Sequence, residues 1–558
     1  MGLPVRSVRQ VAPRAATCLV AGFAVAVSCS IEARREAKPL SGAASATAVV
    51  EAAVAAKPHP RQLAWHEDEF IAFVHFGPNT FTGREWGDGK EDPRLFDPSD
   101  LDTDSWCATL RAAGMKKVIL TAKHHDGFCL WPSRYTMHSV ASSPWRAGSG
   151  DLVRELATSC KKFGLRLGIY LSPADLYQIE AADGLYGNLS AYRERRIPRV
   201  VEARPFAREA SFRFVVDDYN EYFLNQLFEL LTDYGPIHEV WLDGATPKSK
   251  GGQRYSYSAW YALIRALQPE AVIFGRGPDV RWCGNEAGAT RESEWNVVCV
   301  PHPLEEHDWP DRTDDDLGSR EVLAQGLARG NVLHYYPAET NTSLRHGWFW
   351  RDEQQHVKTA ADILDIWYRS VGGNSVFLLN VPPDRRGRFS PRDVRVLEEV
   401  GRVLRSSFAC NLALRSEDGR HREGVRVHAS SALPGFGASL ALDVRGDASA
   451  DLATSWKPVL DDAEVPVWRI DFDEDVHFDR VVLQEDIGRH SQRIERFAVD
   501  VREHGSGAWR EVASATTVGY KRILRLEPQR ARSVRVRFLE SRREPTLAHF
   551  GLFKERRD

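Results

Sequence analysis

Short apolar runs alternate with amphipathic stretches from about residue 61 to Ser407. A short apolar run bounded by turn residues is typical of a buried strand, whereas apolar residues recurring every three or four positions indicate a helix. The runs predict strands at residues 70–77, 117–125, 166–173, 238–244, 271–277, 295–300, 332–337 and 375–381. Strands that take turns with helices form a parallel sheet, and eight of them close into a (β/α)8 TIM barrel.

Amphipathic helices are expected between these strands, at residues 105–113, 151–163, 217–234, 257–267 and 353–369. Three of them are followed by a glycine, which commonly ends a helix: Gly114, Gly164 and Gly235. The helices would cover the outside of the barrel.

After Ser407 the chain changes to short alternating segments without long helices, as at residues 480–483, 497–501, 522–526 and 533–538. This pattern predicts an all-β sandwich, of the jelly-roll, galactose-binding-like kind. We therefore expect a barrel domain at residues 61–410 and a β-sandwich at residues 411–558. The sandwich would bind carbohydrate, close one side of the active site or stabilise the barrel, and the pattern alone favours the last.

The first residues resemble a secretory signal. Arg6, Arg9 and Arg14 precede an uncharged stretch that ends at Ser30, and the segment before Cys29 resembles a bacterial lipoprotein cleavage site. We expect a signal peptide at residues 1–29 and export to the periplasm, the cell surface or the medium, with a lipid on Cys29 as the one expected link to a membrane. Residues 30–60 are rich in alanine and are expected to form a flexible linker.

Composition excludes some classes of function. The 558 residues carry a net charge of −3, so no nucleic-acid partner is expected. Six cysteines lie beyond the leader without a Cys-x-x-Cys pair, which argues against zinc-finger and redox sites. Spacing leaves open whether Cys283 and Cys299 form a disulfide.

Polar side chains stand where five of the predicted strands end. Carboxyl ends of barrel strands meet at one mouth, so these side chains should share a pocket. Asp243 is the most informative, because a carboxylate after the buried run 239–242 needs a partner or a function. The others are His75, His124, His125, Tyr170 and Arg276.

A metal or other cofactor is not expected at this mouth. Neighbouring residues of a strand point to opposite faces, so His124 and His125 bind one ion only if the strand has already ended. The first strand ends in His75-Phe76-Gly77 and lacks a second imidazole. Imidazoles that hydrogen-bond sugar hydroxyls agree better with this arrangement.

If this pocket hydrolyses glycosidic bonds, it needs a second carboxyl besides Asp243 to act as proton donor. Glu286 follows the fifth strand, and the neighbouring Trp282 and glycines provide a partly apolar setting that would raise its pKa. Glu292 and Glu294 compete for this role, and the residues favour Glu286 only slightly.

Four segments together resemble the α-L-fucosidases of glycoside hydrolase family 29. They are residues 73–77, 121–128, 239–244 and 281–286, and the resemblance extends through Asn380 into the C-terminal domain. It implies a retaining mechanism with Asp243 as nucleophile and Glu286 as acid/base. It also implies a fucose pocket lined by His75, Trp86, His124, His125 and Tyr170, to which we add Trp241, Arg276 and, on the apolar side, Trp348 or Phe349.

The segment 282–286 resembles the branch that prefers α-1,3- and α-1,4-linked fucose. Segment 483–487 resembles the same branch, in which the sandwich helps to recognise the neighbouring sugar, whereas residues 489–493 agree less well. Two other classes remain open, a catalytically inactive glycan-binding protein and a metal-dependent barrel hydrolase.

Overall fold

The computed structural model describes residues 45–185, 190–245, 254–302, 309–442, 454–461, 463–503 and 507–557. The predicted signal peptide, Cys29 and the first part of the predicted linker lie outside these residues. No helix in the described ranges has the length and apolar character needed to cross a membrane.

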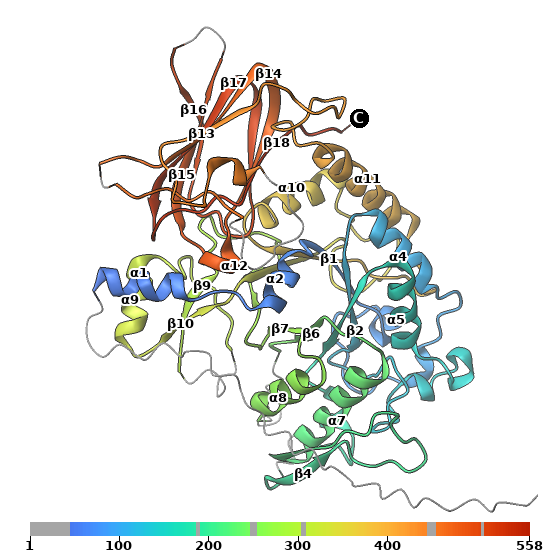
Figure 1. Ribbon diagram of the computed structural model, residues 1–558. Helices are drawn as coiled ribbons and strands as arrows, with labels where there is room; N and C mark the ends of the chain where they lie inside the picture. Colours follow the sequence, from blue (N-terminus) through green and yellow to red (C-terminus); the bar gives the residue numbers. More distant parts are fainter. Residues whose placement is uncertain are drawn as a thin grey trace, which may run out of the picture. The chain divides into compact units, whose positions relative to one another are not determined.

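Eight parallel strands form a nearly closed barrel sheet (Figure 1), in the order β7-β6-β3-β2-β1-β12-β11-β8. The two end strands, β7 and β8, approach each other through a bridge between Phe274 and Val280. The predicted TIM barrel is thus confirmed. Its strands are β1 (Phe70–Val74), β2 (Lys117–Lys123), β3 (Arg166–Leu171), β6 (Glu239–Leu242), β7 (Val272–Gly275), β8 (Arg281–Trp282), β11 (Ala338–Ser343) and β12 (Val376–Asn380).

Two predicted barrel strands were wrong. Residues 295–300 and 332–337 contain β9 (Val297–Val300) and β10 (Val332–Tyr335), which pair antiparallel in a separate sheet. The barrel uses β8 and β11 instead. A second small hairpin consists of β4 (Arg193–Ile197) and β5 (Phe212–Val216).

Capping groups explain where the barrel helices begin and end. The Asp151 side chain accepts a hydrogen bond from the Arg154 N–H at the start of α5, and Gly164 ends this helix with a φ of 66°. Thr359 caps α10, which therefore begins later than predicted. The helices after β1 are α3 (Pro78–Thr82), α4 (Thr103–Ala112), α5 (Leu152–Phe163), α6 (Leu176–Glu180), α7 (Asp218–Asp233), α8 (Tyr257–Leu267), α9 (Arg320–Ala328), α10 (Ala360–Ser370) and α11 (Pro391–Phe408).

The linker prediction was wrong for the segment before the barrel, because this segment forms α1 (Ala46–Ala55) and α2 (Pro60–His66). Val49 and Ala53 of α1 are buried in a cluster that includes Leu323 and Leu327 of α9. The Ser491 hydroxyl also donates to the carbonyl of Ala56. The alanine-rich segment therefore buries its apolar side chains against the rest of the protein.

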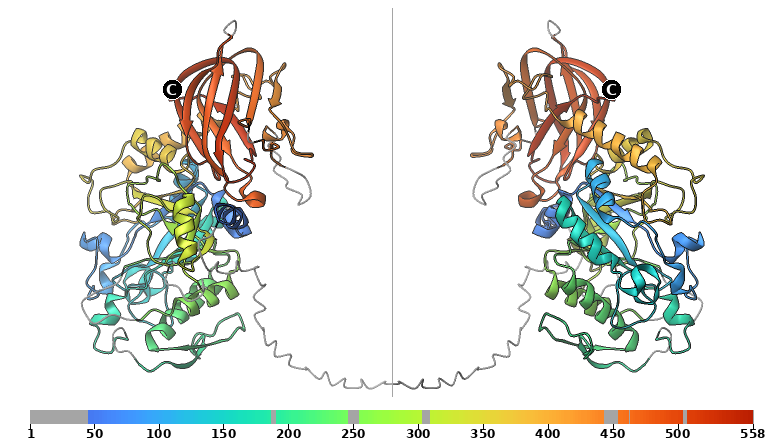
Figure 2. Two further views of the ribbon diagram at one scale, coloured as in Figure 1. Left: turned by 90° about the vertical axis from the view of Figure 1, so that its left-hand side faces the viewer. Right: turned by 90° about the vertical axis from the view of Figure 1, so that its right-hand side faces the viewer.

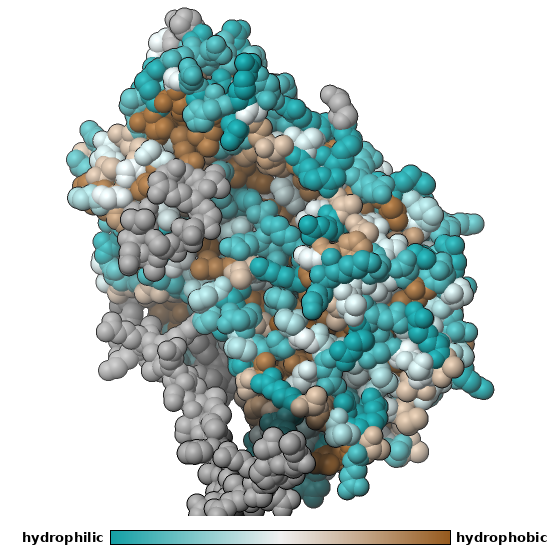
Figure 3. All heavy atoms as spheres, turned by 45° about the vertical axis from the view of Figure 1, so that its right-hand side comes forward, coloured by the Kyte–Doolittle hydropathy of each residue, from teal (hydrophilic) through white to brown (hydrophobic). Residues whose placement is uncertain are grey.

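The C-terminal part is the predicted all-β sandwich. Its apolar side chains, including Trp456 and Trp468, form a core separate from that of the barrel. The strands lie side by side in both views of Figure 2. On the face of the whole molecule shown in Figure 3, hydrophilic residues predominate, with hydrophobic patches between them. The elements are β13 (Arg426–Ala429), β14 (Val467–Gln484), α12 (Ile487–His490), β15 (Ile494–Arg502), β16 (Arg510–Ala515), β17 (Arg522–Ser541) and β18 (His549–Phe553).

Candidate active site

Alternation along the strands directs the predicted residues into the barrel mouth. Phe73 and Trp241 lie in the apolar cluster inside the barrel. Side chains two positions apart on a strand share a face, so His75 and Asp243 continue these inward rows beyond the strand ends. The structure therefore brings both residues to the same mouth.

Each carboxylate oxygen of Asp243 accepts a hydrogen bond from the protein. The Tyr170 hydroxyl donates to Oδ2 at 3.0 Å, and the Ala245 N–H donates to Oδ1 at 2.6 Å. Nε2 of His125 lies 3.9 Å from Oδ2. The side chain keeps 24% of its exposure, so Asp243 is both fixed in orientation and open to a ligand.

The three histidines face one another at the mouth. Nδ1 of His75 lies 2.8 Å from Oδ1 of Asn380, and Nδ1 of His125 lies 2.7 Å from the Ser172 hydroxyl. The rings of His124 and His125 are 4.1 Å apart. Because β2 ends at Lys123, after a register shift, both neighbouring imidazoles reach the site.

Burial keeps these imidazoles neutral. It lowers the pKa of His75 to about 3 and the pKa of His124 well below its usual value. Burial also lowers the pKa of His125, although the charge of Asp243 acts in the opposite direction. At neutral pH the rings can therefore both donate and accept hydrogen bonds, as sugar hydroxyls require.

Aromatic side chains surround the histidines. Trp86 is half exposed, and its ring lies 4.1 Å from that of His125. Trp348 lies 5.1 Å and Phe349 5.3 Å from the ring of His75. Trp241 is buried beside Tyr170, its register partner on the neighbouring strand, with the two ring centroids 5.3 Å apart.

Glu286 lies at an exposed loop tip beyond β8, close enough to Asp243 for their charges to interact. Partial burial of its carboxyl raises the pKa, and the negative charges of Asp243 and Glu85 raise it further. A hydrogen bond from the Trp348 side chain acts in the opposite direction. A raised pKa keeps this carboxyl protonated to a higher pH, as proton donation requires.

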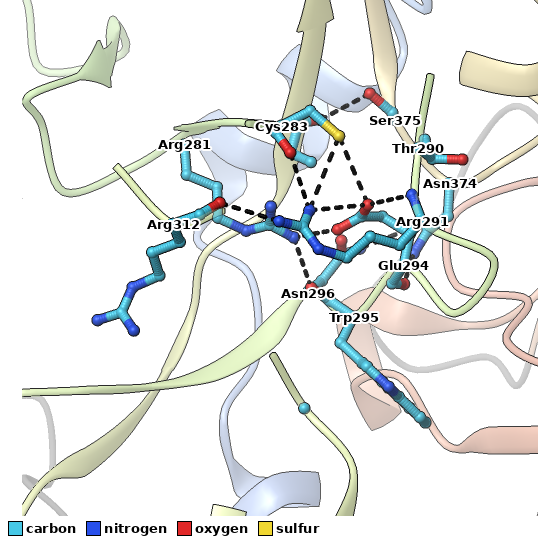
Figure 4. A network of polar contacts seen from close by, with 12 residues as sticks. Arg281, Cys283, Thr290, Arg291, Glu294, Trp295, Asn296, Arg312, Asn374 and Ser375 are labelled. Carbon is cyan, nitrogen blue, oxygen red and sulfur yellow. Dashed lines mark hydrogen bonds and ion pairs between the residues drawn. The ribbon is translucent and has the colours of Figure 1, made fainter. Parts of the chain in front are cut away.

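The other two candidates for the proton donor, Glu292 and Glu294, have different surroundings from Glu286. Glu294 is fully buried and pairs with Arg281 and Arg291 (Figure 4). Glu292 interacts with the charge of Arg522 in the sandwich. Both carboxyls therefore interact with arginine side chains.

The sequence did not single out a third carboxyl at this mouth. Asp311 lies 3.9 Å from Arg276, and burial together with the charge of Asp243 raises its pKa, which Arg276 opposes. No strand run precedes Asp311 in the sequence, so no pattern marked it. The partners of the histidines, Asn380 and Ser172, were detectable, because both also stand at strand ends.

The sequence left open whether Cys283 and Cys299 form a disulfide. Cys283 and Cys299 are unpaired in the structure, and burial raises the pKa of both thiols. Within the described ranges, no group of three or more His, Cys, Asp and Glu side chains has an arrangement that could hold a metal ion.

Two family models match the chain, one in each of its two parts. The model described as Alpha-L-fucosidase matches residues 47–407, and the model described as F5/8 type C domain matches residues 426–549. The chain belongs to the alpha-L-fucosidase family. It is therefore a glycoside hydrolase, and its substrate is a fucosylated glycan.

Individual relatives match over most of the chain. "Alpha-L-fucosidase 1" of Arabidopsis thaliana is 37% identical over 522 residues, which cover 90% of each chain. A solved structure from Bacteroides ovatus is also 37% identical, with a TM-score of 0.72 over 92% of this chain and 77% of that one. A Ruminococcus gnavus GH29 fucosidase in complex with fucose is 28% identical, with a TM-score of 0.72 over 90% and 95% of the two chains.

Proposed function

We propose that this enzyme releases terminal α-linked L-fucose with retention of configuration, with Asp243 as nucleophile and Glu286 as acid/base. The observation that carries the proposal is the position of Glu286 beside Asp243 at the barrel mouth, where partial burial raises the pKa of Glu286 and the charge of Asp243 raises it further. An ionised nucleophile beside a protonated acid is the state that the first step requires.

In the first step, a carboxylate oxygen of Asp243 attacks the anomeric carbon, and the bond to the leaving oxygen breaks as Glu286 donates its proton to that oxygen. In the second step, Glu286 takes a proton from water, and the resulting hydroxide displaces Asp243 from the sugar. Two inversions restore the original configuration. Such a mechanism requires the carboxyls to lie about 5–5.5 Å apart.

The fucose would bind between the neutral histidines and the aromatic side chains. His75, His124 and His125 can hydrogen-bond its hydroxyls, whereas Trp348 and Phe349 offer apolar surface to the C5 methyl group. Trp86 is half exposed beside His125 and would contact the fucose or the leaving group to which the fucose is linked.

We also propose a preference for α-1,3- and α-1,4-linked fucose, on the resemblance of segment 282–286. Segment 483–487 lends this little support, because the buried carboxylate of Glu485 accepts hydrogen bonds from the N–H groups of Arg493, Ile494 and Gly519. Any recognition of the neighbouring sugar would therefore use other residues.

Two measurements test the reaction. NMR of the released sugar, recorded before mutarotation, should show the α-anomer first, and release from a panel of linked fucosides should favour the α-1,3 and α-1,4 linkages. Activity should survive a chelator. An initial β-anomer would refute retention, and equal rates for α-1,2 and α-1,6 linkages would refute the preference.

Variants test the two roles. Asp243→Ala should abolish turnover but recover part of it when azide replaces the nucleophile on an activated fucoside. Glu286→Ala should slow poor leaving groups most, by roughly 10²–10⁴-fold. Full activity of Asp243→Ala, or an unchanged leaving-group dependence in Glu286→Ala, would refute the respective role.

We further propose that the enzyme is exported and that Cys29 carries a lipid, on the pattern of residues 1–29. The mass of the mature N-terminal peptide decides this. A diacylglyceryl-cysteine at position 29 supports the proposal, and an intact Met1 terminus contradicts it.

A further inference from the structure

The loop 283–291, which carries Glu286, has a fixed internal structure. Its two glycines adopt φ angles of 100° at Gly284 and 68° at Gly288, a conformation that other residues rarely take. Between them, Oδ1 of Asn285 accepts the Ala287 N–H at 3.1 Å, and Nδ2 of Asn285 donates to the carbonyl of Ala289 at 2.8 Å. The tip around Glu286 thus depends on how the base of the loop is held.

The carboxylate of Glu294 joins the two ends of this loop (Figure 4). Its Oε2 accepts the Arg291 N–H at 3.0 Å and lies 3.5 Å from the Cys283 thiol. The Arg291 guanidinium, in turn, donates to the Cys283 carbonyl at 2.9 Å. Residues 283 and 291 are therefore tied to one carboxylate, with the loop closed between them.

Buried charges make this junction rigid. Glu294 is fully buried, and its Oε1 pairs with Arg281, which also donates to the carbonyls of Tyr336 and Trp295. The Arg291 guanidinium binds the carbonyls of Arg312 and Asp314 as well. A buried carboxylate paired with two guanidiniums holds its geometry, because loss of one partner leaves an uncompensated charge.

The sandwich holds the backbone of the same residue. The Gln492 side-chain amide donates to the Glu294 carbonyl at 3.1 Å and accepts the Asn296 N–H at 2.8 Å. The Arg542 guanidinium stacks on the Trp295 ring between them, at 3.9 Å from its centroid. The segment that carries Glu294 is thereby fixed from both domains.

We propose that Glu294 is a positioning residue that places Glu286 for proton donation, and that the sandwich contributes through Gln492. This rests on the proposed acid/base role of Glu286. Glu294 is remote from solvent and touches the loop ends, so it acts through the loop and not on the sugar. A shift of about 1 Å in a reacting group can cost roughly 100-fold in rate.

The test uses Glu294→Gln in the full chain, with aryl fucosides whose leaving groups range from 2-chloro-4-nitrophenol to phenol. We expect kcat/KM to fall roughly 10–100-fold for the phenyl fucoside and about 3-fold or less for the activated one, because only poor leaving groups need the acid. The matched control is Glu229→Gln. Glu229 lies on α7, is buried like Glu294 and pairs with one arginine, Arg134. Any loss in the control should be equal for all leaving groups.

An equal loss for all leaving groups in Glu294→Gln, or no loss, would overturn the positioning role. If this variant does not fold, Arg291→Lys is measured in its place, because lysine keeps the charge but loses the guanidinium contacts to three carbonyls. A loss confined to poor leaving groups again supports the positioning role, and an equal loss or no loss overturns it. Glu286→Ala, measured alongside, separates the two proposals. No leaving-group dependence in Glu286→Ala refutes both, whereas dependence there without dependence in Glu294→Gln refutes only the positioning role.

Discussion

Tyr170→Phe removes one hydroxyl from the site and little else. Tyr170 is buried on β3, and its hydroxyl donates to Oδ2 of Asp243 at 3.0 Å. The ring would keep its packing against Phe73 and Trp241 in the barrel interior. With the hydroxyl gone, the carboxylate of Asp243 is held mainly by the Ala245 N–H and can turn about its bond.

The size of the effect follows from the kind of hydrogen bond that is lost. A hydrogen bond to a charged group contributes about 1.5–3 kcal/mol, which corresponds to roughly 10- to 150-fold in rate. Asp243 keeps 24% of its exposure, so water can replace the hydroxyl in part. We therefore expect a loss in the lower half of this range, about 10- to 50-fold in kcat/KM.

The assay combines turnover with trapping of the nucleophile. A 2-deoxy-2-fluoro-fucosyl fluoride reports the attack of Asp243 alone, and its inactivation rate should fall by the same factor as kcat/KM. Tyr135→Phe is the control, because that hydroxyl donates to the carbonyl of Arg199, away from the site. Tyr170→Phe with at least half of the wild-type rate, or an equal loss in the control, would refute the reasoning.

Three further predictions concern the surroundings of the carboxyls. Glu85→Gln removes a negative charge that raises the pKa of Glu286, so the alkaline limb of the kcat/KM profile should move to lower pH; an unmoved limb contradicts this. Asn380→Ala frees the His75 ring and should raise KM for an aryl fucoside about 10-fold by loss of one buried partner, whereas an unchanged KM speaks against that contact. Trp86→Ala should raise KM for fucose-containing substrates several-fold in steady-state assays without unfolding the protein in thermal melts, since half of the ring is exposed; a large drop in Tm would indicate a structural role instead.

The site was predictable where it depends on strand ends. His75 and Asp243 each follow a short apolar run, Tyr170 lies near the end of another, and the geometry of a parallel barrel then brings them together. The pairing of Asp243 with Tyr170 was not predictable, because a hydrogen bond between two strands depends on register, which a single sequence does not fix.

The missing barrel strands had no apolar pattern to reveal them. β11 reads Ala338-Glu-Thr-Asn-Thr-Ser343, yet every residue is buried, because its polar side chains find partners within the barrel. Glu339, for example, accepts hydrogen bonds from the indoles of Trp65 and Trp241. β8 has only two residues, too few for any periodicity. The apolar runs of β9 and β10 are more typical of barrel strands than either segment, although they pair outside the barrel.

The helix α1 was missed for a related reason. Its alanine-rich sequence has a weak apolar face, and its apolar residues become buried only against α9 and the residues near Ile487. Tertiary packing commonly decides such segments, since short helices are marginal in water by themselves. The surroundings of Glu294 also depend on tertiary packing, because Arg281 and Arg291 pair with its carboxylate while Asn374 and Gln492 donate to its carbonyl.

The identity of the nucleophile tests the central claim most directly. The enzyme would be inactivated with a 2-deoxy-2-fluoro-fucosyl fluoride and digested, and the labelled peptide sequenced by mass spectrometry. We predict one fluorofucosyl group per chain, attached to Asp243. A label on another carboxylate, such as Asp311, or turnover with inversion and no covalent label, would contradict the account.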